Sequence, residues 1–212
     1  MAIGDKVIVT CAVTGAVTTK RQCPAIPYTA VEIGEECRRA YEAGATVVHV
    51  HGRSDDGQPS YDPAVFAAYK REIEARSPVI INFSTGAVGL TKEQRINHIL
   101  KTKPHIGALN MGSMNYAKYS AKRKDFVFSF VFANPFDEII YYLKQMNETG
   151  VRPECECFDT SLGMARPTAK TFDTPTSTGR PRRIWGYSDL AAFKRQHSMA
   201  RHIASTSRRD IS

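Results

Sequence analysis

The sequence predicts an α/β protein of the (β/α)8-barrel type, present as an incomplete barrel of about five βα units and followed by a basic C-terminal tail. Short apolar, β-branched runs alternate with amphipathic helical segments over residues 1–160, which is typical of a parallel sheet covered by helices. Polar and glycine residues gather where these runs end. Open doubly wound sheets and barrels both place their sites there, and five polar strand ends converge better in a barrel.

Five segments have the composition of buried strands, and we expect them to pair in parallel and in sequence order. They are residues 7–13, 46–51, 79–84, 106–111 and 154–158. A further apolar run, residues 126–132, fits either an edge strand or a connector. Residues 116–125 are basic and typical of a loop.

Four helices are expected between these strands. Thr29 is a plausible N-cap and Glu32 completes a capping box, so the first helix should run to about Glu42. The other helices are expected to begin at Asp62–Pro63, Thr91 and Asn134–Pro135. In each helix the apolar residues recur at helical spacing on one side, as a helix packed on a sheet requires.

The second strand ends in His49-Val50-His51, followed by Gly52 and Arg53. Residues two apart in a strand point to the same face, so both imidazoles should lie together at the strand end. Two such histidines can hold a divalent metal, or they can be two hydrogen-bonded histidines. The spacing alone leaves both interpretations open.

Two other strand ends carry polar turns. Ser84-Thr85-Gly86-Ala87 leads into a helix, where backbone N–H groups could face an anion. It matches neither a phosphate-binding P-loop nor a dinucleotide fingerprint, which disfavours a nucleotide fold, and a plain tight turn fits as well. Asn110 lies at the end of the fourth strand and could equally serve capping.

Charge divides the chain into two parts. Residues 1–160 have a net charge of +1, whereas residues 161–212 have +7, so the basic character belongs to the tail. The tail is rich in Ser, Thr and Arg and has no strand-like run, which favours disorder. A helix is expected only near 188–204. Either a reading-frame shift near codon 160 or a genuine basic appendage explains the change.

Composition excludes other classes of protein. No apolar run is long enough for a transmembrane helix, and the N-terminus has no signal-like segment. The cysteine count of five is odd, and two of these residues lie in apolar strand-like runs. Together these features predict a reduced, cytoplasmic protein without a membrane partner.

Five motifs, in order, resemble the β-keto acid cleavage enzymes, a family that includes the 3-keto-5-aminohexanoate cleavage enzyme. They are TCAVTGA, VVHVHGRSDDGQPSYDP, VIINFSTGAVG, ALNMGSMNY and GVRPECECFDT, and the resemblance covers residues 5–160. It implies a (β/α)8 barrel with Zn²⁺ that reacts a β-keto acid with acetyl-CoA, giving acetoacetate and a new acyl-CoA. It also implies a homo-oligomer for the full-length family.

The resemblance also assigns residues. His49 and His51 map onto the zinc ligands, and Ser84, Gly86 and Ala87 map onto the substrate-positioning turn, with Ala87 replacing a glycine. Asn110 belongs to the segment that lines the substrate pocket. Glu154, or its neighbour Glu156, maps onto a proton-transferring carboxylate. Arg53, at the same strand end as the histidines, is expected to bind substrate.

The family pattern stops after Thr160, before the late strand that supplies a third zinc ligand, so we expect impaired activity in this chain. Two alternatives stay open. The chain could be a non-catalytic remnant whose basic tail binds an acidic partner, although few aromatic residues and no fold motif disfavour nucleic acid. It could also be another barrel metal-dependent hydrolase.

Overall fold

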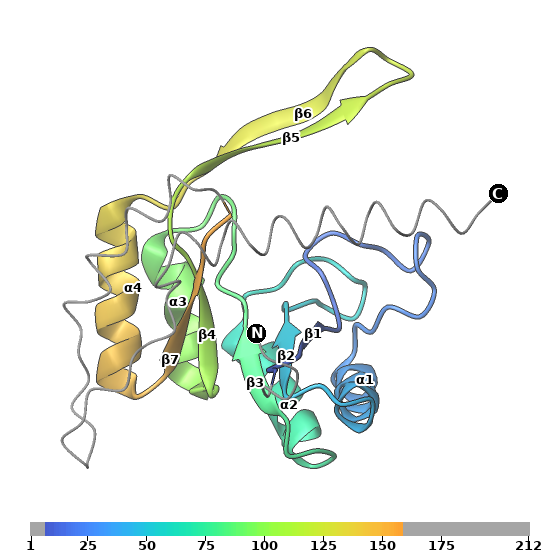
Figure 1. Cartoon of the computed structure of the whole chain (residues 1–212), viewed down its shortest axis with the longest axis vertical. Coiled ribbons are helices and arrows are strands. Elements are labelled where there is room, and N and C mark those ends of the chain that lie inside the picture. Colours follow the sequence, from blue (N-terminus) through green and yellow to red (C-terminus); the bar gives the residue numbers. More distant parts are fainter. Residues whose placement is uncertain (1–6, 159–212) are drawn as a thin grey trace. The chain divides into compact units, whose positions relative to one another are not determined.

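The computed structural model describes residues 7–158, so the expectations for the tail, residues 161–212, lie outside these residues. Five strands form one sheet in the order β1-β2-β3-β4-β7, and every neighbouring pair is parallel (Figure 1). The strands are β1 (Thr10–Ala12), β2 (Val47–Val50), β3 (Ile80–Phe83), β4 (Ile106–Asn110) and β7 (Arg152–Glu156). The predicted parallel pairing in sequence order is therefore confirmed.

Two strand boundaries differ from the expectation. β1 has three residues instead of seven, and Val7, Ile8 and Val9 are largely exposed. Its first paired residue, Thr10, lies opposite Val47, the first residue of β2, and before it the Val9 carbonyl accepts hydrogen bonds from the N–H groups of Thr46 and Val47. β7 begins and ends two residues before the predicted range of 154–158, because its pairing with β4 starts at Arg152.

Helices α1 (Ala30–Glu42), α2 (Pro63–Glu74), α3 (Lys92–Thr102) and α4 (Phe136–Thr149) follow the first four strands of the sheet. Both ends of the Thr29–Glu32 capping box are formed, and Thr91 makes a second one with Gln94. None of the helices in residues 7–158 is both long and apolar enough to cross a bilayer.

Alternation along the strands gives the sheet two different faces. One face, which includes Val48, Val50, Ile81 and Phe83, is fully buried in the apolar core beneath the helices. The intervening residues point to the opposite face and pair in register across it, His49 beside Asn82 on the neighbouring strand. The sheet is therefore apolar toward the helices, whereas its other face combines apolar residues such as Val47 and Ala108 with polar ones toward the strand ends. We call the second face the inner face.

The loop predicted for residues 116–125 is wrong for its first half. β5 (Met114–Ser120) and β6 (Asp125–Phe132) pair antiparallel as a separate two-stranded ribbon, and only four residues form the turn between them. The apolar run 126–132 is therefore a strand, but it does not lie at the edge of the main sheet. Tyr116 and Tyr119 pair with Phe130 and Phe126, and such aromatic cross-strand pairs stabilise strands in an otherwise basic segment.

Candidate functional site at the strand ends

His49 and His51 lie side by side on the inner face. Their Nε2 atoms are 3.1 Å apart, and the rings meet edge to face with centroids 5.0 Å apart. β2 holds His49 within its ladder, whereas His51 follows its last residue, Val50. The predicted same-face arrangement of the two imidazoles is confirmed.

Burial keeps both imidazoles neutral near pH 7. The pKa of His51 is lowered to about 4 by burial first and then by the neighbouring His49 and Arg53. Burial also lowers the pKa of His49, although the Asn82 carboxamide opposes that change. A neutral imidazole keeps a nitrogen lone pair, and a metal ligand needs that lone pair.

The two nitrogens fit a shared zinc ion in part. Tetrahedral coordination at the usual Zn–N distance places two ligand nitrogens about 3.3 Å apart, close to the 3.1 Å observed between the Nε2 atoms. The same separation permits an N–H···N hydrogen bond when no ion is bound. Among residues 7–158, no group of three His, Cys, Asp or Glu side chains could hold a metal. The described part of the chain therefore offers two ligands of the usual three.

Asn82 lies on β3, beside His49 of β2, and its side chain reaches β7 at the edge of the sheet. Its Nδ2 donates a 2.6 Å hydrogen bond to Oε2 of Glu154, 72 residues later. Its buried Oδ1 has no hydrogen-bond partner among the described residues. Sequence reasoning missed Asn82, although a polar residue inside the expected strand 79–84, in register with His49, is a usable signal.

The two strand-end glutamates share the inner face. Burial raises the pKa of Glu154, and the Asn82 hydrogen bond partly offsets this rise. Burial and then the charge of Glu154 raise the pKa of Glu156 to about 7. The contact with Asn82 favours Glu154 as the carboxylate closer to the histidines.

Hydrogen bonds from three different residues hold the turn that begins at Ser84 in place. The backbone N–H of Gly86 donates to Ser84 Oγ at 3.2 Å, and His98 Nε2 contacts the Ser84 carbonyl oxygen at 2.9 Å. The Tyr61 hydroxyl donates to the Gly86 carbonyl at 3.1 Å. Ala87 is buried directly after this turn. The turn is therefore rigid, with a serine hydroxyl on the inner face.

Asn110 ends β4 next to this turn. A Cβ placed on Gly86 would lie 3.4 Å from Ser84 Oγ, 3.6 Å from the Phe132 ring and 3.8 Å from Asn110 Nδ2. The buried Asn110 carboxamide makes no hydrogen bond to another described side chain or backbone group. The Ser84 turn and the Asn110 side chain thus come together at the ends of β3 and β4.

Arg53 lies inside the protein and contacts backbone. Its Nε donates to the Gly57 carbonyl and its Nη2 to the Thr18 carbonyl, both at 2.7 Å, and its Nη1 donates to Gly15. The guanidinium also lies 4.9 Å from the centre of the Tyr28 ring. Arg53 thereby fixes the loop that follows β1, and its substrate contact stays a prediction.

The site predicted from the sequence did not include Arg95. Its side chain supports the Ser84 turn through a hydrogen bond to the Thr85 carbonyl. The guanidinium donates to the carbonyl of Thr85 at 3.3 Å, to Asn134 Oδ1 at 2.7 Å and to the carbonyl of Ala133 at 3.2 Å. Glu138 accepts a further bond. No local signal distinguishes this arginine from the exposed ones on other helices.

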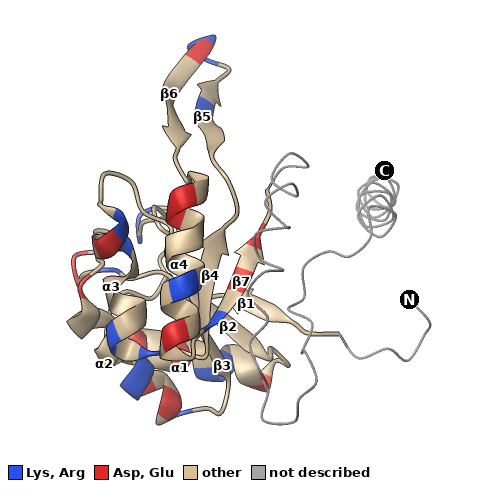
Figure 2. Cartoon of the chain, turned by 90° about the vertical axis from the view of Figure 1, so that its left-hand side faces the viewer, with Lys and Arg blue, Asp and Glu red and all other residues tan. Residues whose placement is uncertain are grey.

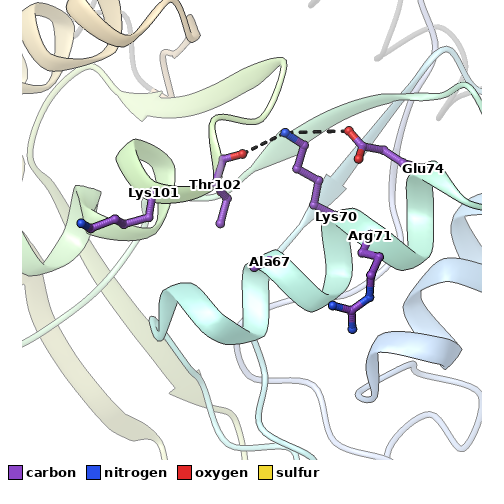
Figure 3. A pocket seen from close by; sticks show the side chains of 6 residues that line it. All are labelled: Ala67, Lys70, Arg71, Glu74, Lys101 and Thr102. Carbon is purple, nitrogen blue, oxygen red and sulfur yellow. Dashed lines mark hydrogen bonds and ion pairs between the residues drawn. The ribbon is translucent and has the colours of Figure 1, made fainter.

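A shallow hollow lies elsewhere, between α2 and α3 (Figure 3). Lys70 crosses it, with Nζ donating to the Thr102 carbonyl at 2.9 Å. Apart from Ala67, the lining residues come from the C-terminal halves of the two helices, which in a parallel α/β unit lie beside the N-terminal ends of the strands. This hollow is therefore separate from the strand-end site.

Known proteins match this chain over a region that extends beyond Thr160, where the sequence motifs placed the end of the family pattern. The profile of the beta-keto acid cleavage enzyme family matches residues 6–174. The 3,5-dioxohexanoate:acetyl-CoA acetone transferase of Paraburkholderia graminis is 38% identical over 176 residues, covering 76% of this chain and 57% of the relative. The 3-keto-5-aminohexanoate cleavage enzyme of Acetoanaerobium sticklandii is 39% identical over 160 residues, covering 74% of this chain and 55% of the relative.

A third relative, the 3-oxoadipate:acetyl-CoA acetyltransferase of Cupriavidus necator, is 34% identical over 156 residues, covering 73% of this chain and 51% of the relative. The chain spans about half the length of the curated relatives it matches. The match includes every strand of the parallel sheet and all the site residues described above. The chain therefore belongs to the β-keto acid cleavage enzyme family.

Proposed function

We propose that the strand-end site belongs to a zinc-dependent acyltransferase of (β/α)8-barrel type. The proposed reaction combines a β-keto acid with acetyl-CoA and yields acetoacetate and the acyl-CoA of the remaining acyl group. The names of the relatives, which combine keto acids with acetyl-CoA, support this class of reaction. The observation that carries the proposal is the neutral His49–His51 pair facing the same side as the Asn82–Glu154 pair and the Ser84 turn.

His49 and His51 would hold the zinc ion through their Nε2 atoms. A bound zinc ion supplies Lewis acidity that polarises a keto group and stabilises enolate charge. The third protein ligand is proposed to come from outside residues 7–158. With two ligands alone, we expect weak binding of zinc.

The chain's own residues would position the substrate around this centre. The Ser84 hydroxyl, which the Gly86 N–H helps to orient, and the backbone N–H of Ala87 are proposed donors to a substrate carboxylate or to a developing oxyanion. The Asn110 amide, which contacts no other described polar group, would donate from the neighbouring strand. Arg53 would act mainly by holding the loop after β1 in place.

Glu154 is the proposed group for proton transfer. Burial raises its pKa above the ordinary value of a glutamate, which is the direction that favours a carboxylate exchanging a proton with the substrate. Asn82 would fix the orientation of this carboxylate through its 2.6 Å hydrogen bond. A cytoplasmic location stays a prediction.

The test is acetoacetate formation from acetyl-CoA across a panel of β-keto acids, with zinc present. We expect the 212-residue chain to be nearly inactive, and a version continued in another reading frame after about codon 160 to be active. The Ser84→Ala variant of the active version should lose about 10²-fold or more in rate. A panel in which neither version forms acetoacetate from any acid would reject the proposed reaction.

A further inference from the structure

One face of the β5–β6 ribbon begins at the strand-end site. Phe132, the last residue of β6, pairs with Met114, and cross-strand partners point to the same side of a ribbon. The Phe132 ring lies 3.6 Å from the position that a Cβ on Gly86 would occupy, and Ser84 Oγ lies 3.4 Å from the same position. The Arg95 guanidinium lies 5.9 Å from the centre of the Phe132 ring. This face of the ribbon therefore starts beside the Ser84 turn.

Three aromatic rings continue the same face along the ribbon. Tyr116 pairs with Phe130, and Phe128 pairs with Lys118. Because residues two apart in a strand point the same way, these side chains share the side of Phe132. The rings of Tyr116, Phe128 and Phe130 contact one another, with centroids 5.4, 6.0 and 6.1 Å apart, and they are 38–48% exposed. We call these three rings and Phe132 the aromatic row. A contiguous exposed patch of this kind marks a binding surface.

The far end of the ribbon is basic. Lys122, Arg123 and Lys124 lie at the turn between its strands, and we call them the basic tip (Figure 2). Lys118 lies opposite Phe128, on the face of the aromatic row. Residues 114–132 contain four Lys and Arg and one Asp, so their net charge is +3. Such a cluster attracts anions, and phosphate groups are its strongest partners.

Coenzyme A carries chemical groups that match this face in kind and in extent. An acyl thioester stands at one end of a long arm, and a diphosphate, an adenine and a ribose 3′-phosphate stand at the other. Adenine presents a flat face that stacks on aromatic rings. Its phosphates are partners for Lys and Arg. β6 has 8 residues and spans about 25 Å, so one CoA molecule is long enough to reach from the Ser84 turn to the rings and the basic tip.

We propose that the aromatic row and the basic tip bind acetyl-CoA. The thioester lies beside the Ser84 turn, the arm crosses Phe132, and the adenine stacks on the three rings further along the ribbon. Lys118 and the basic tip hold the phosphates. The inference rests on the proposed function, because acetyl-CoA is the second substrate of that reaction, and it adds the place where this substrate binds.

Equilibrium dialysis of the full chain with CoA tests the rings without requiring activity, because CoA has no acyl group to transfer. We expect the Tyr116→Ser, Phe128→Ser double variant to bind CoA at least about tenfold more weakly than the wild type. The matched control is Val131→Ser, an exposed residue that pairs with Asn115 on the opposite face and should leave CoA binding unchanged. Far-UV circular dichroism checks that both variants fold.

The basic tip is tested with dephospho-CoA, which lacks the 3′-phosphate. The wild type should bind dephospho-CoA several-fold more weakly than CoA, and its dissociation constant for CoA should rise with salt concentration. In the Lys122→Glu, Lys124→Glu variant the preference for CoA over dephospho-CoA should disappear. A preference that persists unchanged in this variant overturns the proposal.

The outcomes separate the ribbon from the reaction. If the ring variant binds CoA as tightly as the wild type, the ribbon is not the CoA site, and the proposed reaction is unaffected. A ring variant that loses only self-association, measured by sedimentation equilibrium, overturns the proposal in the same way and assigns the rings to a second copy. If the wild-type chain binds no CoA at all, this inference and the proposed reaction both fail.

Discussion

The two faces of the parallel sheet use the same strands for different purposes. The face toward the helices consists of residues such as Val48, Ile81 and Phe83, each fully buried in one core cluster. The inner face presents His49 and Asn82 on the same strands, one residue away. Neighbouring residues of one strand therefore have different roles, one packing in the core and the next facing the site, because successive side chains point in opposite directions.

A core truncation should give the largest effect on stability. Phe83→Ala removes a ring that contacts Phe66 edge to face at 4.9 Å inside the core. We expect a loss of about 3–5 kcal/mol in the free energy of unfolding, from lost transfer energy and a residual cavity. Urea unfolding measures it. The control is Val88→Ala at an exposed position, whose free energy of unfolding should stay within ±0.5 kcal/mol of the wild type. Equal losses of stability in both variants would contradict the assignment of Phe83 to the core.

His49→Ala should instead spare the fold and strongly weaken metal binding. Losing one of two chelating imidazoles is expected to weaken zinc binding by at least about a hundredfold, because a single nitrogen ligand holds the ion poorly. Metal analysis after dialysis against a defined zinc concentration measures it. His105→Gln alters a histidine at the opposite end of the strands and should retain the wild-type zinc content. Equal zinc in all three proteins would exclude His49 as a ligand.

Acid should destabilise the protein in part through His98, which together with His51 has a pKa lowered to about 4. Burial lowers its pKa from an ordinary 6.5 to about 4. The unfolded chain therefore binds the proton first, and the stability contributed by the neutral imidazole is present above pH 6.5 and lost as pH falls toward 4. The loss amounts to at most about 3 kcal/mol.

The His98→Gln variant tests this pH dependence, since it should lose the part of the slope between pH 6.5 and 4 that His98 contributes. Thermal unfolding across that range, compared with the wild type, measures the difference. An unchanged slope would mean that other groups dominate the acid response.

Breaking the Asn82–Glu154 pair should have the smallest effect. Asn82→Ala leaves the buried carboxylate without its donor, so the pKa of Glu154 should rise further and stability at pH 7 should fall by about 1–2 kcal/mol. NMR titration of the carboxyl carbon measures the pKa. Asn110→Ala is the matched control, because it removes a carboxamide with no hydrogen bond to Glu154. A Glu154 pKa that moves equally in both variants would mean that the Asn82 contact has no special role.

Local sequence patterns were sufficient to predict several features of the structure. The capping box at Thr29 and the N-cap at Thr91 involve residues three apart, and the shared face of His49 and His51 follows from the two-residue period of a strand. The parallel order also followed from the alternation of strands and helices. The Ser84 turn was visible as a polar break after an apolar run.

Only the tertiary structure decided the remainder, because those features depend on residues far apart in the sequence. Asn82 meets Glu154 across 72 residues, and Arg53 reaches carbonyls 35 and 38 residues earlier instead of pointing to solvent. The ribbon of residues 114–132 formed because aromatic pairs between its two strands outweigh a basic, loop-like composition. Local propensity specifies single elements, whereas pairing partners and burial are set by the whole fold.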